Sequence, residues 1–385
     1  MTIIDYRGAT EMVTFGGKTY PAESIAGGAA FEIVTDDGVR HFVHRSDLGD
    51  VPPAPDLDTP LRVPLSRVVT WDSVHRLSQV PPRGGLPGLI AEVRASATIR
   101  RGTRMVKPLN ARAVAEVLKG SPPHGFCYRE YDVAHLRTPQ DWSVLTGEGD
   151  AQIVFALRWR AVDPLDYVVP GPDSGLTRLA PHDRVGPPVL GTGFAPSGSQ
   201  LIPEFLTADT ADLPMTANAT LLAFTADGTE VPLYTYQAEQ RAWLRLAGPQ
   251  WRHILITLRD VRPEQEYLAM PPDRRSSTRL MGWFQGEEYE AIADPPETFR
   301  VLAMTRAARY AVERLRRRTS YGRWRGEVVT VLQAEAEWCR LRLVDPTPEA
   351  ISATGAQCYE RGVYEIWASR LELTEMRDVD VEYRV

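Results

Sequence analysis

The sequence predicts a mostly β protein in which small barrels flank a central α+β domain. One spacing of aromatic, glycine and β-branched residues occurs three times, in residues 15–34, 283–302 and 324–343. The 31 prolines and 29 glycines are spread over 385 residues without a period, which favours short strands joined by turns over long helices. Two proline-rich stretches, 50–60 and 270–278, separate the outer parts of the chain from the middle.

Each copy of the repeated spacing predicts a strand, a glycine turn, a second strand, a polar connection and a third strand. The first copy is followed by Asp37-Gly38, which is a strong signal for a tight hairpin turn. The first and third copies also end alike, with an aromatic, an arginine, an acid and a leucine in the same order. The equivalent positions in the three copies are Phe15, Gly17, Tyr20 and Phe31, then Phe284, Gly286, Tyr289 and Phe299, then Trp324, Gly326, Val329 and Trp338.

Short strands of period two with aromatics at fixed places are typical of a small barrel whose interior is filled by side chains. By this strand spacing, residues 1–51, 280–320 and 321–385 resemble the SH3-like barrel repeats of bacterial proteins. The resemblance implies one such barrel before the central domain and two in tandem after it. It also implies interaction modules, because barrels of this class commonly bind proteins or pack between larger domains. It brings no catalytic residue with it.

Residues 60–270 are expected to form the central α+β domain. Residues 110–120, NARAVAEVLKG, predict a helix that begins after Asn110 as N-cap and ends at Gly120. Residues 138–147, TPQDWSVLTG, predict a second short helix. Elsewhere strand patterns dominate, in GFCYREYDVAHL, QIVFALRW, ATLLAFTADGTEVPLYTY and RAWLRL.

The charge balance excludes a general attraction to nucleic acid or to an anionic membrane. Fifty acids and forty-four bases leave a net charge of −6. The arginines of residues 314–325 lie among aromatics, a pattern that can hold phosphates and bases, but pairing with the neighbouring acids is the favoured interpretation. Neither a leader pattern nor a long apolar run is present, so a cytoplasmic location is expected.

Sites built on cysteine or histidine are not expected. Cys127, Cys339 and Cys358 are odd in number and widely separated, so they predict reduced thiols and no disulfide framework. His124 and Cys127 are three apart on a predicted strand and would point to opposite faces, which argues against a nucleophile and base. The histidines lack the spacing of metal ligands, so no metal is expected.

A different arrangement uses three separated pieces of the central domain. Arg129, Ser197 and the pair Gln237 and Glu239 follow one another in an order that resembles the Arg, Ser and Gln-x-Glu order of ADP-ribosyltransferases. The resemblance implies that Arg129 holds a phosphate of NAD, that Ser197 shapes the nicotinamide pocket and that Glu239 stabilises the ribosyl cation. The Ser-Thr-Ser signature of that family is absent here, and YQAEQ also fits a plain hairpin connection.

The leading functional prediction is an intracellular binding or regulatory protein that works through SH3-like modules, with a protein partner and no cofactor. Its contact surface is expected at the conspicuous residues Trp283, Trp324, Arg325 and Trp367. The alternative is an NAD-using ADP-ribosyltransferase or NAD glycohydrolase, with the catalytic residues in the central domain.

Overall fold

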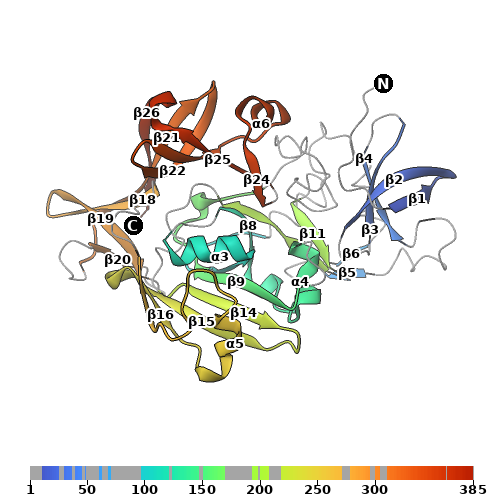
Figure 1. The fold of residues 1–385 in the computed structure, drawn as a ribbon, viewed down its shortest axis with the longest axis horizontal. Helices are drawn as coiled ribbons and strands as arrows, with labels where there is room; N and C mark the ends of the chain where they lie inside the picture. Colours follow the sequence, from blue (N-terminus) through green and yellow to red (C-terminus); the bar gives the residue numbers. More distant parts are fainter. Residues whose placement is uncertain are drawn as a thin grey trace.

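The architecture was obtained as a computed structural model (Figure 1). The structure describes residues 11–25, 30–36, 40–45, 48, 60–62, 68–70, 97–120, 124–146, 151–169, 193–197, 200–207, 218–270, 278–294, 300–303, 310–360 and 362–384. The fold is mostly β, as the sequence predicts, and its sheets are dominated by antiparallel pairs. Asp37-Gly38, the predicted hairpin turn of the first copy, lies outside the described residues.

The N-terminal strands form a four-stranded antiparallel sheet in chain order. Phe15 pairs with Lys18 across a hairpin whose two central residues, Gly16 and Gly17, both have positive φ, as a two-residue turn of this hand requires. Alternate residues such as Phe31 and Ile33 point into one small apolar core. The strands are β1 (Glu11–Phe15), β2 (Lys18–Ile25), β3 (Ala30–Val34) and β4 (Arg40–His44).

The central sheet has nine antiparallel strands and carries an apolar core on each face. Its strands alternate between the two cores, since Met105 and Leu109 of one strand pack on one side and Val106 on the other. In spatial order the strands are β10 (Tyr167–Val168), β13 (Phe205–Thr207), β8 (Gly125–Arg129), β7 (Arg104–Leu109), β9 (Ile153–Arg160), β14 (Thr220–Thr225), β15 (Glu230–Gln237), β16 (Ala242–Arg245) and β17 (Tyr267–Ala269).

Short helices cover the two faces of the central sheet. Helix α3 (Ala111–Leu118) begins where Asn110 accepts a hydrogen bond from the Ala113 amide at 2.8 Å, which is the predicted N-cap. Helix α4 (Pro139–Thr146) begins with reciprocal bonds between Thr138 and Asp141. The remaining helical turns are η3 (Glu130–Asp132), η4 (Pro164–Asp166), η6 (Ala238–Gln240), η7 (Pro249–Trp251) and α5 (Arg252–Leu255). A small separate sheet has the order β11 (Phe194–Ser197), β12 (Gln200–Pro203), β5 (Pro60–Arg62) and β6 (Val68–Thr70).

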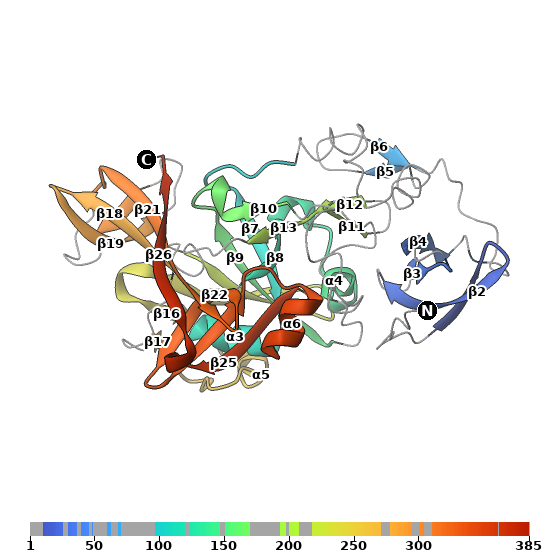
Figure 2. The ribbon, with the colours of Figure 1, turned by 90° about the horizontal axis from the view of Figure 1, so that it is seen from above.

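The strands after residue 278 form one continuous C-terminal sheet (Figure 2). Residue 320, the expected boundary between two tandem units, lies inside one strand, β21 (Arg314–Trp324). This strand is long enough to pair with β18 by its first half and with β22 by its second. The other strands are β18 (Thr278–Phe284), β19 (Glu287–Asp294), β20 (Arg300–Ala303), β22 (Glu327–Glu335), β23 (Trp338–Leu343), β24 (Gln357–Glu360), β25 (Val363–Ser369) and β26 (Thr374–Tyr383), with α6 (Pro348–Thr354) before β24 and η9 (Arg370–Glu372) after β25.

The central and C-terminal sheets share their interiors. Ile292 of β19 belongs to the main core of the central sheet. Val162, which follows β9, belongs to a core formed mainly by β18, β19 and β21. Buried charges accompany this apolar contact: Arg317 donates to Asp166 at 2.7 Å, and the Tyr383 hydroxyl donates to the same carboxylate oxygen. None of the helices in the described part of the chain has the length and apolar character needed to cross a bilayer.

Asp166→Ala is expected to lower the free energy of unfolding by about 3–5 kcal/mol, because it leaves the buried Arg317 guanidinium without this carboxylate. Denaturant unfolding measures the loss. Glu264→Ala is the control, since it breaks the exposed Arg252–Glu264 pair and should cost less than about 1 kcal/mol. Equal losses for the two variants would show that the buried pair contributes no more to the free energy of unfolding than the exposed pair does.

Candidate functional site

Arg129, the first of the three residues predicted to bind NAD, is engaged in a structural contact. It ends β8 and is 2% exposed. Its guanidinium donates to both carboxylate oxygens of Asp132, at 2.7 and 3.2 Å, and to the Thr98 carbonyl at 3.0 Å. A phosphate would have to displace a buried bidentate ion pair to reach this side chain.

Ser197 and Glu239 lie on other elements. Glu239 is exposed in η6, directly after β15. Three strands separate β15 from β8, so the two strands are about 19 Å apart along the sheet at the usual strand spacing. Ser197 ends β11 in the small separate sheet, and its side chain is outside the described part of the structure. The described contacts therefore lend no support to an NAD site at these positions.

The four residues predicted to bind a partner differ in their exposure. Trp324 is 3% exposed, and its indole nitrogen donates to Glu372 at 2.8 Å, so it belongs to the core of the C-terminal sheet. The exposed Arg325 side chain lies over the Trp324 ring, 4.4 Å from its centroid. Trp283 is half-buried beneath the guanidinium groups of Arg314 and Arg316, each 4.4 Å from the ring centroid. Trp367 is the most exposed of the three tryptophans in this set.

A second exposed tryptophan accompanies Trp367. Trp338 is 54% exposed and Trp367 is 39% exposed. Trp338 pairs with Ser369 across β23 and β25, and Arg340 pairs with Trp367. The two tryptophans are thus diagonal neighbours on one face of the sheet, at a separation of about 7–8 Å between their backbones. We call Trp338 and Trp367 together the tryptophan surface.

The strands that carry the tryptophan surface are fixed by buried charges on the same face. Arg340 donates to Glu365 of β25 and to Glu116 of α3, at 2.6 and 2.7 Å. Arg342 donates to the other oxygen of Glu365 at 3.2 Å. The Tyr359 ring packs against Arg340 as well, at 5.1 Å from the guanidinium carbon. Together these charge-assisted hydrogen bonds hold β23, β25 and α3 in one arrangement.

In the central sheet, the pairing between β7 and β8 stops early and leaves the two strands apart. Strands β7 and β8 pair only through Met105 and Val106, and after these residues β7 continues beside β9 alone. Pro108 of β7 has no N–H to donate to a ladder. The Lys107 ammonium takes the place of the missing ladder bonds, because it donates to the Phe126 carbonyl of β8 at 3.1 Å.

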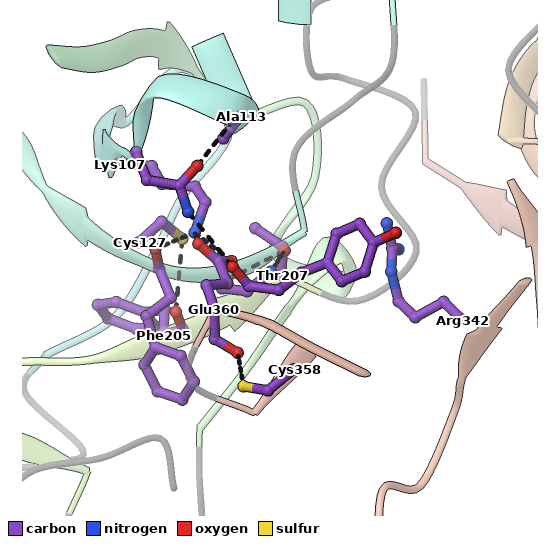
Figure 3. Close-up of polar contacts among 12 residues, drawn as sticks. Lys107, Ala113, Cys127, Phe205, Thr207, Arg342, Cys358 and Glu360 are labelled. Carbon is purple, nitrogen blue, oxygen red and sulfur yellow. Dashed lines mark hydrogen bonds and ion pairs between the residues drawn. The ribbon is translucent and has the colours of Figure 1, made fainter. Parts of the chain in front are cut away.

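Lys107 also joins the central sheet to the C-terminal sheet. Its ammonium donates to both carboxylate oxygens of Glu360 of β24, at 2.7 and 3.0 Å, and Figure 3 shows the two side chains pointing toward one another. Burial raises the pKa of Glu360, and the Lys107 charge opposes that rise. Gly125 makes the approach possible, since a Cβ at this position would lie 2.0 Å from the Glu360 carboxylate.

A cleft of about 450 Å³ opens at the split, between β7, β8, the end of α4 and β24. Its polar groups are already engaged: the Tyr128 hydroxyl donates to Glu204 at 3.1 Å, and the Cys358 thiol donates to the Glu360 carbonyl at 3.0 Å. The cleft is therefore best understood as part of the contact between the two sheets. Within the described ranges, no group of three or more His, Cys, Asp and Glu side chains is placed to hold a metal ion.

Neither the Lys107–Glu360 pair nor the exposure of Trp338 can be predicted from the sequence patterns. The first joins residues 253 positions apart, and its only local signal is a lysine before a proline in a strand pattern. The repeat predicts that Trp338 is equivalent to Phe31, yet Phe31 is buried and Trp338 is exposed. Ala336 has a positive φ in the two-residue turn that pairs Glu335 with Trp338.

Gly125→Ala is expected to destabilise the fold by about 1–3 kcal/mol more than Gly102→Ala, because the added methyl overlaps the Glu360 carboxylate. Gly102 also has positive φ, but a Cβ there meets nothing within 4 Å. Thermal or denaturant unfolding gives both values. In the Glu360→Ala background the extra cost of Gly125→Ala should shrink, and additivity of the two changes would show that Gly125 does not accommodate this side chain.

Comparison with known proteins supplies no family for the arrangement described above. No family model, no curated protein and no solved structure matches the chain. The function therefore has to be inferred from the contacts of its own residues.

Proposed function

We propose that the chain is an intracellular binding or regulatory protein that contacts a protein partner through its C-terminal sheet, in the manner of SH3-like interaction modules. The observation that carries the proposal is the tryptophan surface. Trp338 and Trp367 are exposed side by side on strands whose neighbouring side chains are locked by buried ion pairs.

Exposed tryptophan is the residue type that contributes most to protein interfaces. A large, rigid ring gains much apolar contact and loses little conformational entropy on binding, and tryptophan is enriched among the residues that dominate binding energy. Here the backbone beneath the rings is already ordered by Arg340 and Glu365. A partner would therefore meet a preorganised surface.

The charges around the tryptophan surface indicate what the partner presents. Glu335 pairs directly with Trp338 across β22 and β23, and Glu337 precedes it in the turn; both are exposed. Arg370, on η9, is the exposed base nearest in sequence to Trp367. A segment that offers an apolar or aromatic side chain flanked by lysine or arginine would complement this arrangement.

The double variant Trp338→Ala with Trp367→Ala is expected to lose binding of the partner by at least about tenfold, because interface tryptophans commonly contribute more than 1.4 kcal/mol each. Wild type, the double variant and Ile256→Ala would be immobilised and exposed to extract of the source cells, and retained proteins quantified by mass spectrometry. A retained candidate is then purified and titrated against all three forms by calorimetry.

Ile256→Ala is the matched control, because Ile256 is also a large exposed apolar residue but follows α5 on the central domain. Its binding should equal that of wild type. The proposal is contradicted if every purified candidate binds the double variant as tightly as wild type, or if no retained protein distinguishes the double variant from the control.

A further inference from the structure

The outer edge of β25 has no neighbouring strand along residues 366–369 in the described part of the chain. β24 pairs with β25 only as far as Glu365, which lies opposite Gln357. Before Gln357 the chain forms α6, which packs onto the core that contains Ala368. Ala368 and Trp367 are successive residues of one strand, so this core lies on the face opposite the tryptophan surface. Helix α6 therefore does not cover the tryptophan side of this edge.

Within the described ranges, the unpaired backbone groups of this edge belong to Trp367 and Ser369. The Arg370 N–H donates to the Glu337 carbonyl at 2.8 Å, and these two residues lie directly opposite one another when the register of β23 and β25 is continued. In an antiparallel pair, the backbone groups of successive residues point alternately toward the partner strand and away from it. Those of Ala368 therefore point toward β23, whereas those of Trp367 and Ser369 point outward, where a further strand could pair with them.

A strand added at this edge would meet the tryptophan surface with alternate side chains. Residues that lie opposite one another in a sheet share a face, so the added side chain opposite Trp367 would pack against that ring. The added side chain opposite Ser369 would extend over this small residue to Trp338, which lies across from Ser369 on β23. An apolar residue suits the first position. Arginine suits the second, because a guanidinium stacks on the face of a tryptophan ring.

The charge beside Trp338 favours the same residue. Glu335 lies directly opposite Trp338 and Glu337 adjoins it in the turn, and both acids are exposed. Glu335 accepts a hydrogen bond from the Gln333 amide, which is a neutral donor. Among the described residues, neither acid is in an ion pair. An arginine from the added strand would therefore bring the complementary charge.

We propose that the protein partner adds an extended segment to the outer edge of β25 as a further strand, with an apolar residue beside Trp367 and an arginine two positions away over Trp338. This inference rests on the proposed function, because it uses the same tryptophan surface, and it adds the mode of contact and the chemistry of the partner segment. Backbone pairing gives a contact of this kind its affinity, and the alternate side chains give it specificity.

Ser369→Pro and Ser369→Ala form a matched pair of variants for this edge. Ser369 has a φ of −65°, which is the value that a proline ring imposes, so proline fits the backbone here and removes the outward N–H. Both substitutions remove the hydroxyl that accepts a hydrogen bond from the Leu371 amide at 3.3 Å. The two variants therefore differ in the N–H that a further strand would use.

The probe is the blocked peptide acetyl-Arg-Thr-Val-Thr-Arg-amide, whose symmetry presents valine and arginine alike in both strand directions. Calorimetric titration of the full chain is expected to give affinities within about twofold for wild type and Ser369→Ala, and an affinity at least about fivefold lower for Ser369→Pro, as the loss of one hydrogen bond predicts. N-methylation of the valine removes the donor that faces Trp367 and should weaken binding to wild type at least about fivefold. N-methylation of the second threonine, whose N–H faces away from β25, is the control.

The two N-methylated peptides keep the test decisive if Ser369→Pro does not fold. The inference is overturned if wild type does not bind the probe up to its solubility, if methylation of the valine weakens binding no more than methylation of the threonine, or if a folded Ser369→Pro binds as tightly as Ser369→Ala. It is also overturned if sedimentation shows wild type to be a dimer that Ser369→Pro dissociates, since the edge would then take a second copy of this chain.

The failure of this inference can be distinguished from the failure of the proposed function. A cellular protein that loses binding to the double variant Trp338→Ala with Trp367→Ala, but binds Ser369→Pro as tightly as Ser369→Ala, would support the tryptophan contact and refute strand addition. A cellular protein that binds the double variant as tightly as wild type would count against the tryptophan contact itself.

Discussion

Buried ion pairs between the central and C-terminal sheets fix how the two sheets meet. Lys107 pairs with Glu360, Arg317 with Asp166, and Arg340 with Glu116. Apolar packing alone would let one sheet shift against the other, whereas a shift that leaves a buried charge without its partner is strongly unfavourable. We infer that these pairs select one register between the sheets, and that the shared apolar cores stabilise the register once it is selected.

This constraint determines which side chains remain on the surface. The face of β23 and β25 that carries Arg340 and Glu365 is covered where it meets α3, and Trp338 and Trp367 lie on the same face beside that contact. Figures 1 and 2 both place α3 next to this part of the C-terminal sheet. Arg340 and Glu365 are buried on this face, whereas Trp338 and Trp367 remain exposed on it.

Local patterns in the sequence predict the elements well, because their causes are local. The Asn110 cap and the helix near residue 139 follow from side chains within four positions of each other, and the strands follow from alternation. The face of a residue is harder to predict, since a bulge or a one-residue shift moves a side chain to the opposite side. Strand β22 has such a shift between Val331 and Gln333. Phe31 and Trp338 hold equivalent positions in the repeat pattern, and Phe31 is buried while Trp338 is exposed.

The pairing of charges is the reason for proposing Trp338 and Trp367, and not Trp283, as the contact surface. The two guanidinium groups over the Trp283 ring belong to Arg314 and Arg316, and Arg316 pairs with Glu288 and with Asp380. A partner at Trp283 would have to displace groups that already satisfy one another, so much of its binding energy would be spent on breaking them. No ring or cation contact covers Trp338 or Trp367 among the residues the structure describes. Their apolar surface is available without any rearrangement, so under the proposed function a partner would lose less energy to desolvation at Trp338 and Trp367 than at Trp283.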